Sequence, residues 1–182
     1  MRIGILRMGH VDTQVAQEIM NGLITSFPGA TFEAIEETQV VSEKAFDKKR
    51  RQHRSDVVLR EIQAFSSQNG GLDRVLGIVD LDVFVPSLNF VFGEATCPGK
   101  VALISLWRLR PEFYGNASDM ELFLERSLKE AVHELGHTFG LNHCSRASCV
   151  MHFSNSILDT DKKQSLFCDE CHLKIITRMN RN

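Results

Sequence analysis

The chain has 182 residues, 43% of them hydrophobic, and a formal net charge of -2. This length and composition predict one compact domain, or one domain with a small appendage. The near balance of charge predicts neither nucleic acid nor an anionic membrane as a partner. No stretch reaches the ~18 apolar residues of a membrane span, and the N-terminus lacks a signal-peptide cleavage site, so we expect a cytoplasmic protein.

The first stretch of the chain predicts a strand and a helix, the start of an α/β layer. Residues 2–8 are expected to form a buried strand, and Asp12 or Thr13 is expected to cap the helix that follows. A second, fraying strand is expected within residues 30–41. The basic run 48–54 could contact phosphates, but it lacks interleaved aromatic residues, so a solvated loop is the favoured interpretation.

The middle of the chain predicts a helix and a central strand. Ser55 is expected to cap the helix, which ends at the Asn-Gly-Gly stretch 69–71. Residues 74–85 are too apolar for a solvent-facing strand and predict a central one. Asp80 and Asp82 could ligate calcium, but two polar residues at a strand end are the favoured interpretation.

A hairpin is predicted next. Residues 90–95 and 100–109 are expected to form neighbouring strands around a Pro-Gly turn. The segment 101–107 is the candidate edge strand for an extended peptide, because such an edge can extend a sheet through backbone hydrogen bonds. Trp107 and Arg108 could line a pocket, but a lone tryptophan is more often a core residue, so Trp107 is expected in the core.

A long helix is expected to begin near residue 118 and to lead into the histidine motif that starts at His133. Ser118 followed by Glu121 is the spacing of a capping box, so Ser118 is the predicted N-cap. The helix should bury an apolar stripe at three- to four-residue spacing, formed by Leu124, Leu128, Ala131, Leu135 and Phe139.

The run His-Glu-Leu-Gly-His at 133–137 places His133 and His137 on one helical face, about one turn apart, as two zinc ligands require. Gly140 permits a sharp left-handed turn, after which His143 can return as a third ligand. Glu134 lies about 100° around the helix, which suits a base acting on metal-bound water. Three nitrogens, an open coordination position and a carboxylate are the minimum for a hydrolytic zinc site.

Four cysteines after the histidines form two pairs: Cys144 with Cys149, and Cys168 with Cys171. Together they match a closed, tetrahedral, structural zinc site; disulfides or unligated thiols are the alternatives. The odd cysteine count and the C-x-x-C spacing favour reduced thiols. Cys97 is left over, as a buried or loop cysteine. A C-terminal helix is expected over 171–179.

The combination of these motifs resembles the archaemetzincin family of zinc metalloproteases. The resemblance implies an α+β (mixed α/β) metzincin-like fold: a twisted mixed sheet and an active-site helix above a small C-terminal zinc-knuckle subdomain. It implies a single domain over 1–182, with an upper subdomain 1–143 and a lower subdomain 144–182. Met151 would form the methionine turn beneath the catalytic metal. No tyrosine follows Met151, as one often does in other metzincins, and His152 is a weak candidate for its role.

The predicted function is zinc-dependent peptide-bond hydrolysis with two Zn²⁺, one catalytic and one structural. The catalytic ligands would be His133, His137 and His143, with Glu134 as general base, and the structural ligands Cys144, Cys149, Cys168 and Cys171. The small size and the lack of a visible pro-segment predict short peptides as substrates. The alternative is a zinc-stabilised binding protein with little proteolytic activity.

Overall fold

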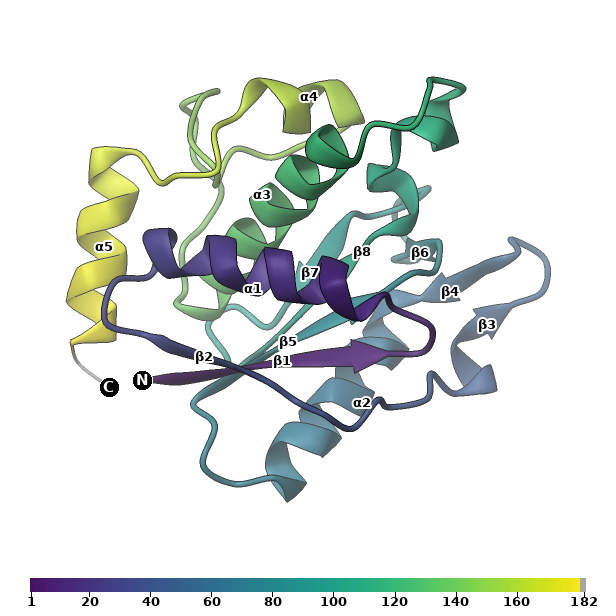
Figure 1. Cartoon of the computed structure of the whole chain (residues 1–182), viewed down its shortest axis with the longest axis horizontal. Helices are drawn as coiled ribbons and strands as arrows, with labels where there is room; N and C mark the ends of the chain where they lie inside the picture. Colours follow the sequence, from purple (N-terminus) through teal and green to yellow (C-terminus); the bar gives the residue numbers. More distant parts are fainter. Residues whose placement is uncertain (181–182) are drawn as a thin grey trace.

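A five-stranded sheet lies at the centre of the computed structural model, which describes residues 1–180 (Figure 1). Its strands are β1 (Arg2–Met8), β2 (Thr31–Ala34), β5 (Arg74–Val79), β7 (Gly93–Ala95) and β8 (Val101–Ser105). The strand order is β2-β1-β5-β8-β7; β7 alone is antiparallel to its neighbour. A second, small sheet contains β3 (Phe46–Asp47), β4 (Gln52–Arg54) and β6 (Val83–Phe84), in that order.

Helices cover both faces of the large sheet. They are α1 (Thr13–Ser26), α2 (Ser55–Gln68), α3 (Met120–Thr138), α4 (Ile157–Lys162) and α5 (Asp169–Met179), with short 3-10 turns at η1 (Glu43–Ala45), η2 (Trp107–Leu109) and η3 (Pro111–Tyr114). Figure 1 shows α1 and α3 on one side of the sheet and α2 on the other. Among residues 1–180, no helix combines the length and apolar character needed to cross a bilayer.

Alternation along the strands divides the apolar side chains between two cores. In β8, Ala102 and Ile104 join the core shared with α1 and α3, whereas Val101 and Leu103 join the core shared with α2. Successive side chains of a strand point to opposite faces, so a strand covered by helices on both faces is apolar throughout. This arrangement confirms the predicted mixed α/β architecture.

The first elements agree with the sequence prediction. β1 spans the predicted residues, and Asp12 caps α1 by accepting hydrogen bonds from the backbone N–H groups of Gln14 and Val15. β2 is parallel to β1 but covers only four residues of the expected 30–41 stretch.

Two predicted caps were wrong. Ser55 is the first residue of α2, not its cap, and its buried hydroxyl donates to the carbonyl of Phe84. Asp119, not Ser118, caps α3, accepting from the N–H of Leu122. In both cases the helix starts one residue away from the predicted position.

The segment 74–85 is broken, not one strand. It forms central β5 and, after a bend, the short β6 of the second sheet. The two aspartates of the bend lie in ion pairs: Asp82 with Arg108, at 2.7 Å, and Asp80 with Arg110. This agrees with the strand-end interpretation, because the arginines supply the positive charge that a calcium ion would have supplied.

The exposure of Trp107 differs from the prediction, whereas most of the basic run 48–54 is exposed, as predicted. Trp107 is 45% exposed and is not a core residue. The basic run forms the turn between β3 and β4 together with β4 itself, and Arg50 is held there by the carbonyls of Leu88 and Asn89. Arg50 also lies 3.9 Å above the ring of Phe84, so a portion of this run has a structural role.

β2 and β7 are the two edge strands of the large sheet, and β7 is the one that lines the cleft. The segment 101–107, predicted to be the edge, contains β8, which pairs with β5 on one side and β7 on the other. An interior strand has both backbone edges occupied, so this prediction was wrong. At the cleft, Gly93–Ala95 is therefore the strand that can accept another strand.

Candidate active site

The last turns of α3 and the loop after it position the three histidines. His133 and His137 lie one turn apart on α3, which ends at Thr138. Gly140 has φ of 80°, the left-handed conformation expected from the sequence, and the chain reverses there toward His143. One ligand nitrogen from each of the three rings can be chosen such that all lie within 4.8 Å of one another.

Hydrogen bonds orient two of the rings. The Nδ1 of His133 lies 2.8 Å from the carbonyl of Val150, and the Nδ1 of His137 lies 2.7 Å from that of Leu141, so each Nδ1 carries the proton. The lone pairs are therefore on the Nε2 atoms, which lie only 3.0 Å apart. Two facing lone pairs repel each other unless a cation lies beside both, so this donor set fits a metal ion.

Burial keeps the imidazoles neutral. Burial first, and then the positive charge of Lys163, lower the pKa of His133 well below its usual value. Burial is also the main cause of the lowered pKa of His137 and of His143. Neutral imidazole is the form that binds a metal, so the site favours ligation over protonation.

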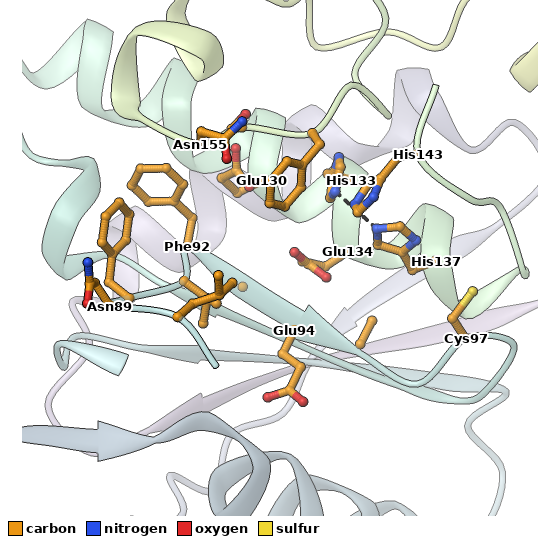
Figure 2. A pocket seen from close by; sticks show the side chains of 17 residues that line it. Asn89, Phe92, Glu94, Cys97, Glu130, His133, Glu134, His137, His143 and Asn155 are labelled. Carbon is orange, nitrogen blue, oxygen red and sulfur yellow. Dashed lines mark hydrogen bonds between the residues drawn. The ribbon is translucent and has the colours of Figure 1, made fainter. Parts of the chain in front are cut away.

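Glu134 lies in the cleft beside the histidines, opposite the edge strand β7 (Figure 2). Burial raises its pKa well above the usual value, the neighbouring Glu130 adds to this, and Lys163 opposes it. A Cβ added at Gly93 would lie 2.5 Å from the Cγ of Glu134, so only glycine allows this close approach. Figure 2 shows that the side chain of Glu94, the next residue, points away from the histidines.

Met151 is fully buried beneath the active-site helix. Its Sδ would lie 2.5 Å from a Cβ added at Gly136, so the thioether packs directly against the backbone of α3. His152 does not line the cleft; its Nδ1 lies 2.9 Å from the carbonyl of Cys144. The geometry therefore gives no support for His152 as a substitute for the missing tyrosine.

The cleft has a volume of about 390 Å³ and is lined by residues 88–95 on one side and by Phe153–Asn155 on the other. The ring of Phe153 lies 4.8 Å from that of His143. Sequence reasoning missed Phe153, Asn155 and Glu130 as lining residues. Glu130 lies on the same face of α3 as His133 and Glu134, three and four residues earlier, and that spacing was the available signal.

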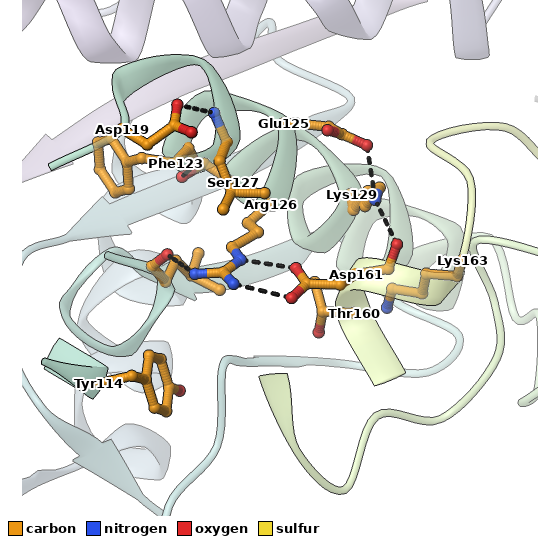
Figure 3. A network of polar contacts seen from close by, with 12 residues as sticks. Tyr114, Asp119, Phe123, Glu125, Arg126, Ser127, Lys129, Thr160, Asp161 and Lys163 are labelled. Atoms are coloured by element: carbon orange, nitrogen blue, oxygen red, sulfur yellow. Dashed lines mark hydrogen bonds and ion pairs between the residues drawn. The ribbon is translucent and has the colours of Figure 1, made fainter. Parts of the chain in front are cut away.

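A network of ion pairs holds α3 against α4 (Figure 3). Arg126 binds Asp161 through Nε at 2.6 Å and Nη2 at 2.8 Å. Glu130 lies 2.9 Å from the fully buried Lys163 and accepts a hydrogen bond from Thr160. Because Glu130 and Lys163 neutralise each other, α4 can cover the helix that carries the histidines without leaving a buried charge unpaired.

The four cysteines after the histidines also meet. One sulfur from each of Cys144, Cys149, Cys168 and Cys171 lies within 4.8 Å of the others, and all are free thiols. The sulfurs of Cys144 and Cys168 are 3.9 Å apart. Tetrahedral zinc with bonds of about 2.3 Å would separate its sulfur ligands by about 3.8 Å, so the cluster fits zinc. Cys97 lies apart, exposed in a loop at the rim of the cleft.

Thiol chemistry at this cluster agrees with metal binding. Burial opposes ionisation of Cys168, but the backbone N–H of Cys171 and the neighbouring thiols outweigh it and lower the pKa of Cys168 to about 7. Burial raises the pKa of Cys171. The thiolate is the form that ligates, so Cys168 is the better prepared of the two for metal.

The model of peptidase family M54 matches residues 19–177 of the chain, which includes all these motifs. The chain belongs to peptidase family M54. As a member of family M54 it is a zinc metallopeptidase.

Archaemetzincins are among the relatives of this chain. The archaemetzincin of Saccharolobus solfataricus is 37% identical over 175 residues, which are 96% of this chain and 93% of the relative. That of Pyrococcus abyssi is 47% identical over 138 residues, 76% of this chain and 73% of the relative.

Solved structures of the family share the fold. The crystal structure of archaemetzincin from Methanopyrus kandleri matches with a TM-score of 0.85 at 33% identity, covering 100% of this chain and 96% of that one. The archaemetzincin of Archaeoglobus fulgidus, complexed with malonate, matches with a TM-score of 0.80 at 37% identity, covering 96% and 99%. The predicted family resemblance and metzincin-like fold are thus confirmed.

Proposed function

We propose that the chain hydrolyses peptide bonds at a zinc ion held by His133, His137 and His143, with Glu134 as the general base. The convergence of three neutral imidazoles beside a buried carboxylate carries this proposal. When bound, zinc would polarise the scissile carbonyl and make the attacking water more acidic.

Glu134 would accept the proton of the attacking water and later deliver it to the leaving amine. Its raised pKa suits both tasks, because a general base works best when its pKa approaches the working pH. Met151, packed beneath α3, would fix the height of the helix below the three ligands. The residues present therefore suffice for positioning, ligation and proton transfer.

The substrate would be a short peptide that binds in an extended form along β7. β7 lies at the end of the sheet and borders the cleft, so its free backbone edge can pair with a substrate strand. The modest cleft supports recognition of a few residues at a time.

A second zinc would be held by Cys144, Cys149, Cys168 and Cys171, and four thiolates would leave no position for a reactant. We also propose that 1–182 form one domain with an upper subdomain, residues 1–143, and a lower subdomain, residues 144–182. One continuous core supports a single domain, since Val150 and Ile175 of the lower subdomain join the cluster that contains Ile5 and Ile104.

Replacing Glu134 by Gln tests the proposal. Loss of the base should lower peptide cleavage about 10²–10⁴-fold while the zinc content stays unchanged, because Glu134 is not a ligand. A peptide library digested with wild type and with Glu134→Gln, followed by mass spectrometry and by metal analysis of the same samples, gives the measurement. Glu121→Gln, an exposed change on the same helix, is the control.

Full activity in Glu134→Gln would refute its role as the base. No cleavage of any peptide by fully zinc-loaded wild type would instead favour the alternative, a zinc-stabilised binding protein.

A further inference from the structure

A second hollow, which we call the Arg74 pocket, lies against residues 138–140, the turn that connects His137 to His143. It has a volume of about 740 Å³ and shares no lining residue with the active-site cleft. Its polar side chains are Asp73, Arg74, Lys100, Thr138 and Arg178.

Arg74 is a buried cation without a carboxylate partner. It is 7% exposed, and among residues 1–180 no acidic group lies within ion-pairing distance of it. Its guanidinium stacks 3.8 Å above the ring of Phe139. Its Nε donates to the hydroxyl of Thr138 at 3.0 Å, and its Nη1 lies 3.4 Å from the sulfur of Met1; Nη2 takes no part in either contact. A cation this buried is usually paired with an anion.

The other charges of the pocket are unbalanced too. Within the described residues, neither Lys100 nor Arg178 forms an ion pair, and Arg178 donates only to the carbonyl of Phe139, at 2.8 Å. The one carboxylate, Asp73, already accepts from the backbone N–H of Arg2 at 2.7 Å. Three cations face one carboxylate, an excess of two positive charges.

Stabilisation of the carboxyl end of α3 does not account for this whole arrangement. Arg178 binds a carbonyl there, as a cation at a helix C-terminus commonly does. Arg74, however, binds the side chain of Thr138 and no carbonyl of α3, and Lys100 makes no side-chain hydrogen bond to the helix among residues 1–180. The helix end therefore does not explain why two further cations line the hollow.

We propose that the Arg74 pocket binds a small dianionic oxyanion of the phosphate class, either free phosphate or a phosphate ester. Guanidinium groups match tetrahedral oxyanions through paired N–H donors, and Lys100 adds a point charge at the rim. A dianion would neutralise the excess charge. It would also hold residues 138–140, and with them the loop that carries His143.

Isothermal titration calorimetry of the full, zinc-loaded chain with inorganic phosphate tests this proposal. Potassium chloride keeps the ionic strength constant, which removes the general stabilisation by salt. We expect one phosphate per chain, and binding about tenfold weaker in Lys100→Met and in Arg178→Met, because each removes a charge-assisted contact. Lys162→Met, an exposed change on α4, should bind phosphate like wild type.

Titration with phosphoserine distinguishes the two sources. Tighter binding than inorganic phosphate would assign an ester as ligand, and equal or weaker binding would assign free phosphate. Two results would overturn the proposal: no saturable binding to wild type in the millimolar range, or binding that both variants retain in full, which would place the anion elsewhere, such as at the catalytic metal. None of these readouts depends on peptide cleavage, so they are independent of the proposed function.

Discussion

Burial shifts the pKa values of the three histidines and of Glu134 in opposite directions at the candidate active site. The three imidazoles must be neutral to hold a metal, and burial lowers the pKa of each. In the proposed mechanism Glu134 takes up a proton, and burial raises its pKa. The same desolvation thus moves both kinds of group toward their neutral forms, since it penalises positive and negative charge alike.

The lowered histidine pKa values predict how the stability of the metal-free protein depends on pH. In the unfolded chain histidines bind protons below about pH 6.5, whereas the folded imidazoles stay neutral to lower pH. The unfolded state then binds more protons, so the free energy of unfolding should fall as the pH drops through 6.5, by up to about 1.4 kcal/mol per pH unit for each group. Urea denaturation of chelator-treated protein at several pH values gives the measurement.

Glu134 contributes with the opposite sign, because a raised carboxyl pKa favours the folded state as the pH falls. The decline should therefore be steeper in Glu134→Gln and shallower in His133→Gln. A stability that does not change between pH 7.5 and ~5.5 would contradict the burial of these imidazoles.

At the scale of elements, the site depends on how closely α3 approaches β7. Register places Gly93 opposite Ile104, on the sheet face that α3 covers, and Glu94 opposite Leu103, on the other face. Glu134 occupies the space that a side chain at position 93 would need. The edge strand therefore supplies one wall of the pocket around Glu134, and it is also the strand proposed to pair with a peptide.

Gly93→Ala should displace Glu134 or β7. The added Cβ would lie 2.5 Å from the Cγ of Glu134 and 2.6 Å from the carbonyl oxygen of Leu103, and the rigid sheet backbone cannot move away at low cost. We expect cleavage to fall at least about tenfold with zinc content retained, since small displacements of catalytic groups have large effects on rate. Steady-state kinetics and metal analysis measure this.

Gly70→Ala is the matched control, because a Cβ there meets no atom within 4 Å and the change should leave kcat/KM unaltered. Equal activity of both variants would show that the close contact at Gly93 is not required.

At the scale of the whole molecule, the C-terminal segment, residues 144–180, forms one side of the cleft. Ion pairs join α4 to α3, and Arg178 joins α5 to the end of α3. The cysteine cluster links the loop after His143 to the start of α5. This segment is short for a core of its own, so metal binding should contribute much of its folding free energy.

Cys149→Ser should remove one of two zinc ions per chain and lower the free energy of unfolding by more than about 4 kcal/mol. Limited proteolysis should then cut within residues 144–180 first. Cys97→Ser lies outside the cluster and should keep both metal ions and wild-type stability. Metal analysis and thermal unfolding give the readout, and a Cys149→Ser protein with two zinc ions would contradict the four-thiolate site.

By itself, the sequence determined the features that depend on neighbours along the chain. One helical turn separates His133 from His137, Gly140 permits the reversal before His143, and either Asp12 or Thr13 can cap the first helix, all because local backbone geometry is set by short-range spacing. Only the tertiary structure decided that Gly93–Ala95 is the edge strand, that Lys163 pairs with Glu130, and that Arg74 lines a basic pocket. Strand order and buried ion pairs arise from segments distant along the chain, and no periodicity in the sequence records which of these segments meet.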